Sequence, residues 1–101
     1  MKIPNNIKIG WRDYTVEFIE ERIDEDEELL DGEIDFSNHI IYINNDLLNE
    51  DEKIVTFLHE IIHGVFQSQG HSEWGSNEDL IEAVSEGLFL VMKDNPRVFS
   101  D

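Results

Sequence analysis

Residues 56–69 read TFLHEIIHGVFQSQ and contain the strongest pattern in the chain. Apolar residues recur from Ile54 to Phe66 with the 3.6-residue period of an amphipathic helix that faces a core. On such a helix His59 and His63 lie one turn apart and about 40° apart around the axis, at the edge of the apolar stripe. The pattern therefore predicts two imidazoles that can reach the same point beside the core.

His59, Glu60 and His63 form the motif H-E-x-x-H, which is typical of zinc hydrolases. A catalytic zinc ion takes two imidazoles and a third protein ligand, and keeps a fourth position for water, whose pKa falls to roughly 7. The Glu60 carboxylate lies beside that position and can accept a proton as a general base. The alternative is a helix that carries two surface histidines and a glutamate without any function.

The third ligand is expected on the last helix, where Glu78, Glu82 and Glu86 stand four residues apart in one acidic stripe. Like charges at this spacing destabilise a helix by roughly 0.2–0.5 kcal/mol per pair unless a cation lies close to them. Glu78 has its own explanation, because the helix dipole favours a negative charge in the first turn. Glu82 follows His63 by 19 positions, which leaves room for a helix end, a loop and the start of a second helix.

We therefore predict a Zn²⁺ site with His59, His63 and Glu82 as its ligands. Glu78 and Asp79 are the alternatives to Glu82.

Three further residues are candidates for supporting roles. Glu86, one turn beyond Glu82, would accept a hydrogen bond from the other ring nitrogen of a ligand histidine, or is a solvated surface carboxylate. A zinc hydrolase also needs a group that stabilises the oxyanion of the transition state, for which His71 and Tyr42 are the candidates. Each of these two residues has a purely structural alternative, His71 in a loop and Tyr42 in a strand.

The composition is strongly acidic, with 24 acidic and 7 basic residues among 101 and a net charge of −17. This charge excludes nucleic-acid binding through a basic surface, disfavours anionic membranes and favours cationic partners. The absence of cysteine excludes disulfides, thiolate ligands and a cysteine nucleophile. No apolar segment has the length of a signal peptide or a membrane span, so we expect a cytoplasmic protein.

Alternation of apolar and polar residues predicts two β-hairpins before the motif helix. The first has alternating runs at 7–12 and 14–19 with its turn at 10–13, and the second has strands at 33–36 and 40–43. The acidic stretch at 20–28 is expected to be a solvated loop or a strand end.

The motif helix is expected from about Glu50 to Gln69, with Asn49 as its N-cap and Gly70 after its end. Residues 71–77 are expected to form a loop. A second helix should begin at Ser76 or Asn77 and run to about Lys93, because Pro96 prevents its continuation. The whole pattern predicts one domain, residues 1–101, in which two hairpins are followed by the motif helix and a C-terminal helix.

The segment TFLHEIIHG, followed by a loop and NEDLIEAVSEGLFLVM, resembles the small zinc metallopeptidases of the gluzincin type, in which a glutamate ligand follows H-E-x-x-H on the next helix. More narrowly, it resembles the ImmA/IrrE-like proteins of phages and mobile elements, whose second helix carries an E-A segment, here Glu82-Ala83. The preceding GEIDFSNHIIYIN is similar to the strand pair that those proteins place before the motif helix. Val84 and Met92-Lys93 depart from the narrower family, which has an asparagine after E-A and a methionine-proline ending.

The resemblance implies a minimal zincin-like α+β fold, in which a small antiparallel sheet of two hairpins packs on the motif helix and the C-terminal helix completes the site. It also implies the hydrolysis of a peptide bond by water. It implies a peptide or protein substrate, with a basic regulatory protein among the candidates. The alternative function is an acidic binding module that mimics nucleic acid, with zinc as a structural element. Glu60 discriminates between the two, because a structural zinc site needs no general base.

Overall fold

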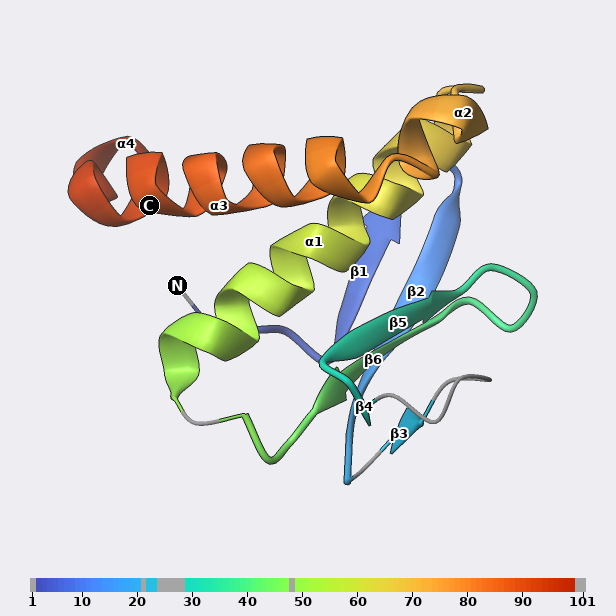
Figure 1. Cartoon of the computed structure of the whole chain (residues 1–101), viewed down its shortest axis with the longest axis horizontal. Coiled ribbons are helices and arrows are strands. Elements are labelled where there is room, and N and C mark those ends of the chain that lie inside the picture. Colours follow the sequence, from blue (N-terminus) through green and yellow to red (C-terminus); the bar gives the residue numbers. More distant parts are fainter. Residues whose placement is uncertain (1, 21, 24–28, 48, 100–101) are drawn as a thin grey trace.

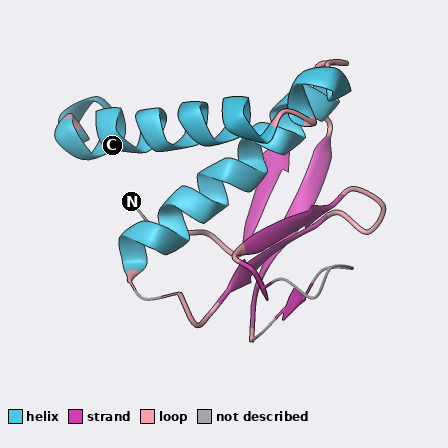
Figure 2. Cartoon of the chain, in the orientation of Figure 1, coloured by secondary structure: helices cyan, strands magenta, loops and turns pink. Residues whose placement is uncertain are grey.

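A computed structural model describes residues 2–20, 22–23, 29–47 and 49–99, and it confirms the α+β class. Helix α1 packs on one face of a four-stranded sheet, and α3 crosses α1 on the side away from that sheet (Figure 1). Figure 2 shows the same helical and strand layers coloured by type. The strands are β1 (Asn6–Ile9), β2 (Arg12–Ile19), β3 (Arg22–Ile23), β4 (Leu29–Leu30), β5 (Gly32–Asp35) and β6 (Ile40–Asn44). The helices are α1 (Glu50–Ser68), α2 (Ser72–Gly75), α3 (Glu78–Asp94) and α4 (Pro96–Phe99).

The sheet has the order β1-β2-β6-β5 and is mixed, not antiparallel as predicted. Both predicted hairpins are present, since β1 pairs with β2 and β5 with β6 in antiparallel fashion. The two hairpins join through β2 and β6, which run parallel with Val16 opposite Ile41. The alternation of residues within each hairpin carries no information about how two hairpins meet, so this pairing could not be predicted locally.

Strands β3 and β4 form a separate two-stranded sheet. β3 lies within the acidic stretch 20–28 and β4 follows it directly. Residues 21 and 24–28 of this stretch lie outside the described residues.

The core lies between the sheet and α1, where the two central strands present their inner side chains. Ile41 and Ile43 of β6 are fully buried and belong to the same cluster as Val16 of β2 and Phe57 of α1. Because side chains alternate along a strand, Tyr42 lies on the opposite face of the sheet.

Gly32, the first residue of β5, allows this edge strand to approach α1 closely. A Cβ atom at position 32 would lie 2.6 Å from Thr56 Cγ2 and 3.0 Å from the carbonyl oxygen of Tyr42. Contacts this short require β5 or its neighbours to move, so a side chain at position 32 would push β5 away from α1. The close approach brings β5 beside the turn of α1 that carries the motif.

The predicted ends of α1 are confirmed. The Asn49 side chain accepts a hydrogen bond from the backbone N–H of Glu52 at 2.9 Å, and so caps the helix. The helix ends at Ser68, and Gly70 has a φ of +79°, the left-handed conformation that glycine favours at this position.

The segment between the two long helices is more ordered than the predicted loop, because α2 forms within it. The backbone N–H of His71 donates to the carbonyl of Phe66 at 2.8 Å, and the short helix Ser72–Gly75 follows at once. Asn77 then caps α3 by accepting from the backbone N–H of Leu80 at 3.1 Å. This compact connection places the first turn of α3 beside the C-terminal half of α1.

At its other end α3 stops before Pro96, as predicted, and the short helix α4 begins with that proline. Among the described residues, no helix combines the length and the apolar character that crossing a bilayer requires.

Candidate metal centre

Three potential ligands meet where the first turn of α3 approaches α1: His59, His63 and Glu78. The Nε2 atoms of the two histidines are 3.2 Å apart. The two carboxylate oxygens of Glu78 lie 3.1 Å from His59 Nε2 and 3.2 Å from His63 Nε2. In a tetrahedral site with zinc–nitrogen distances near 2.05 Å, neighbouring ligand atoms are separated by about 3.3 Å. The three side chains are therefore spaced as the ligands of one small metal ion would be.

The two histidines are mostly buried, whereas Glu78 is open to solvent. The exposed fractions of their side chains are 19% for His59, 15% for His63 and 66% for Glu78. The rings of the histidines are tilted by 60° with their centres 4.9 Å apart, as expected for residues one helical turn apart. An ion at this position would be held from the core side by the imidazoles and from the solvent side by the carboxylate.

His63 is held in a form that can bind a metal. Burial lowers its pKa, as does the neighbouring His59, against the opposing effect of Glu78, so the ring is neutral at pH 7. Its ring also hydrogen-bonds to the backbone carbonyl of Gly75 in α2. Because Nε2 faces His59 and Glu78, the nitrogen that donates to Gly75 is Nδ1. This bond leaves the lone pair of Nε2 directed at the centre.

Glu60 is buried beside the three potential ligands, with only 6% of the residue exposed. Burial, and then the negative charges of Glu78 and Glu33, raise the pKa of Glu60 to about 8. Burying a carboxylate is costly for a folding chain, and groups with such perturbed pKa values occur preferentially at functional sites.

The raised pKa predicts how the stability of the metal-free protein depends on pH. The folded protein holds the Glu60 proton up to about pH 8, whereas the unfolded chain releases it near 4.5. The contribution of the protonated Glu60 to the free energy of unfolding is therefore fully present below pH 4.5 and is lost as the pH rises through about 8. Between pH 5.5 and 8.5 we expect the free energy of unfolding to fall by up to about 3 kcal/mol because of this group.

Urea denaturation in the presence of a chelator, at these two pH values, measures this loss in the wild type and in Glu60→Gln. Glutamine has the same shape and no titration, so the difference between the two proteins isolates Glu60 from the histidines. An equal change in both proteins would show that the carboxyl group is not buried in an unfavourable environment.

A hollow of about 440 Å³ opens in front of these groups. Glu60 lines it together with all three potential ligands, and the opposite wall is the edge strand β5 with Gly32 at its start. The site therefore combines a potential metal centre, an acid–base group and space for a bound molecule.

The third potential ligand is Glu78 and not Glu82, the residue preferred from the sequence. Glu82 is exposed one turn further along α3, and it does not belong to the group that meets at the centre. The reason is the position of the crossing between α1 and α3, which lies at the very start of α3. Glu78 was the stated alternative, and the dipole argument that set it aside does not prevent a first-turn carboxylate from binding a cation.

The three residues assigned to supporting roles lie away from the hollow. Glu86 is exposed on α3, and the position next to the His63 ring that it was expected to occupy is taken by the Gly75 carbonyl. The ring of His71 stacks on Trp74 with centres 3.7 Å apart, and its Nδ1 atom lies 3.0 Å from Glu73. Tyr42 is on the far face of the sheet.

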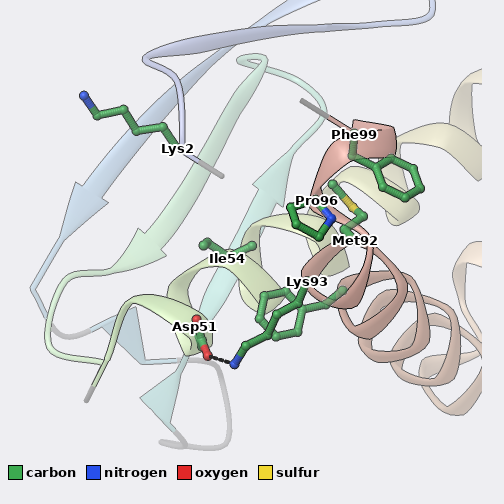
Figure 3. Close-up of a pocket in the computed structure, with 8 residues that line it drawn as sticks. Lys2, Asp51, Ile54, Met92, Lys93, Pro96 and Phe99 are labelled. Atoms are coloured by element: carbon green, nitrogen blue, oxygen red, sulfur yellow. Dashed lines mark hydrogen bonds and ion pairs between the residues drawn. The ribbon is translucent and has the colours of Figure 1, made fainter. Parts of the chain in front are cut away.

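A second hollow of about 430 Å³ lies at the other end of α1 and has a different character. Its walls are mainly apolar, and at its mouth Lys93 of α3 forms an ion pair with Asp51 of α1 at 2.8 Å (Figure 3). Neither motif histidine reaches it. This end of the molecule ties the start of α1 to the end of α3.

No family model, curated protein or solved structure matches the chain in the three comparisons made. The interpretation of the site therefore depends on its own geometry. His59, His63 and Glu78 define a His-His-Glu centre that could hold a metal ion, next to the buried Glu60.

Proposed function

We propose that the protein is a zinc-dependent hydrolase that cleaves peptide bonds. The observation that supports this most strongly is the juxtaposition of the His59, His63 and Glu78 ligand atoms, at 3.1–3.2 Å, with the buried carboxyl group of Glu60. Two imidazoles, one carboxylate and an adjacent general base are the donor set of a catalytic zinc site. The resemblance to gluzincin metallopeptidases agrees with this donor set.

Zinc bound at these ligands would supply a Lewis acid that polarises the carbonyl group and lowers the pKa of water to roughly 7. Its positive charge would also act on Glu60 against the effects of Glu33 and Glu78, and so lower the pKa of that carboxyl group. Glu60 would then be ionised at neutral pH and able to act as a base.

The proposed role of Glu60 is to carry one proton between two reacting atoms. It takes a proton from the attacking water while the new carbon–oxygen bond forms. It then gives that proton to the leaving nitrogen as the carbon–nitrogen bond breaks. The products are a carboxylic acid and an amine, and Glu60 returns to its ionised form.

The edge strand β5 offers a place for an extended substrate. Gly32 and Ile34 line the hollow, and among the described strands β5 pairs only with β6. A peptide can add to the edge of a sheet through main-chain hydrogen bonds, which suits a peptide or protein substrate. The net charge of −17 favours a basic substrate, such as a basic regulatory protein of a phage or mobile element. The cytoplasm is the proposed compartment.

The charge also supports a second candidate function, an acidic module that binds a basic protein and uses zinc only as a structural element. The buried Glu60 favours the hydrolase, because a structural site gains nothing from an additional carboxylate that raises the cost of folding.

The proposal is tested with a randomised peptide library and the purified protein, first stripped with a chelator and then reloaded with Zn²⁺. We expect one equivalent of zinc to bind, and mass spectrometry to detect cleavage products only in the loaded sample. His63→Ala should abolish both zinc binding and cleavage. Zinc binding without any cleavage would contradict the hydrolase and support the binding module.

A further inference from the structure

Helix α3 has an apolar face that is not the face packed on α1. Its buried residues, Ile81 and Ser85, lie on one side of the helix. On an ideal helix, a second set of residues, which are apolar or glycine, falls within an arc of about 120° that is centred roughly 140° away from Ile81 and Ser85. This set, which we call the outer face, comprises Leu80, Ala83, Val84, Gly87, Leu90 and Val91.

The outer face is open to solvent. Figure 1 shows no described element over α3 on the side away from α1. Three of its aliphatic side chains are exposed, Val84 by 37%, Leu90 by 55% and Val91 by 50%. A Cβ atom added at Gly87 would meet nothing within 4 Å. A contiguous apolar surface of this kind on a highly charged protein indicates an interface.

Charge is distributed unevenly around α3. Glu78, Glu82 and Glu86 lie together on another side of the helix, outside the arc of the outer face. Asp94, in the last turn, is the only charged residue of α3 within that arc. A protein with a net charge of −17 can bring two copies together only through a surface that keeps carboxylates apart, and the outer face meets this condition.

The outer face also complements itself. If two copies of α3 cross antiparallel about a twofold axis at Gly87, each residue that precedes Gly87 meets the residue equally far beyond it in the partner copy. Ala83 then faces Val91, and Val84 faces Leu90, so that a smaller side chain meets a larger one in both central pairs, while Leu80 lies opposite Asp94 at the periphery of the contact. The absence of a side chain at Gly87 allows the two helices to approach closely at the crossing.

We propose that the protein forms a homodimer through the outer face of α3, with Gly87 at the crossing point. The aliphatic side chains that would be covered expose on the order of a few hundred Å² per copy, which corresponds to a small and reversible interface. Raising the salt concentration should strengthen this dimer, because salt screens the repulsion between the two acidic copies and leaves apolar contact intact.

Sedimentation of the full chain over a range of concentrations, at 50 mM and 500 mM NaCl, tests the oligomeric state. We expect a monomer–dimer equilibrium that shifts towards the dimer at high salt. Leu90→Asn should raise the dissociation constant at least about tenfold, whereas Trp11→Asn, which removes a larger exposed side chain from the β1–β2 turn, should leave it unchanged. A monomer at all concentrations and at both salt concentrations would overturn the proposal.

A single introduced cysteine tests the crossing point, since the chain has no other. With helix axes 8–10 Å apart, the two Cα atoms at position 87 would be about 5 Å from each other, within the range that a disulfide spans. We expect Gly87→Cys to form a disulfide-linked dimer at least about ten times faster than Glu86→Cys under the same oxidant. Equal rates would overturn the assignment to the outer face, even if the wild type were dimeric by sedimentation.

Discussion

Replacing Glu60 with glutamine is expected to lower kcat by at least about 100-fold, because general acid–base catalysis by one positioned group contributes roughly 10²–10⁴ to the rate. Glutamine keeps the shape of the side chain and can neither accept nor return the proton. The substitution leaves His59, His63 and Glu78 in place, so zinc content should remain at one equivalent. KM should change little, because Glu60 acts on the water and the leaving nitrogen and does not bind the peptide chain.

The measurement is the initial rate on a peptide cleaved by the wild type, together with metal analysis of the same samples. Zinc content is the necessary control, since a loss of rate that accompanies a loss of zinc would show only that the site had been damaged. A variant that kept more than a tenth of the wild-type kcat with zinc bound would show that another group moves the proton.

The second large effect is expected at Glu78. Glu78→Gln replaces the carboxylate ligand with a neutral amide, and we expect zinc to bind at least about 100-fold more weakly. Changing a residue that only supports a ligand already costs 10–100-fold in affinity, and a direct ligand should cost more. In the wild type, zinc at 100 times its dissociation constant should add about 2.7 kcal/mol to the free energy of unfolding, and Glu78→Gln should lose most of this gain.

Glu82→Gln is the matched control, because it makes the same chemical change one turn further along the same helix. Its zinc affinity should stay within about threefold of the wild type, since the Glu82 carboxylate does not reach the histidines. Competition with a fluorescent zinc chelator gives both affinities. If Glu82→Gln lost more affinity than Glu78→Gln, the ligand first chosen from the sequence would be the right one.

The helices were the most predictable part of the fold, because their signals are local. The period of the apolar residues and the capping side chain of Asn49 predict α1 to within one residue at its end, and Gly70 adopts the left-handed conformation expected there. The two hairpins follow equally from alternation. The parallel contact between β2 and β6 does not, because it joins strands that are distant in the sequence and depends on which edges the hairpins present.

As with the fold, the part of the site that depends on local sequence was predictable and the part that depends on long-range contacts was not. His59 and His63 come together through helical geometry alone, since residues one turn apart must face the same side, and Glu60 lies next to His59 in the sequence. Glu78 belongs to another helix, so its position depends on the tight turn at His71 and on α2, neither of which has a strong sequence signal. The one usable signal was Asn77, because an N-cap there puts Glu78 at the first helical position.

Local spacing thus determined the relative positions of the two imidazoles and of Glu60 between them, because backbone dihedral angles in a helix leave no other arrangement. The identity of the third potential ligand, the Gly75 carbonyl that orients His63 and the burial of Glu60 were decided by how α2, α3 and β5 pack on α1. These features arise from contacts between segments far apart in the chain, and the free energy of such contacts depends on the whole packed structure, not on any single stretch of residues.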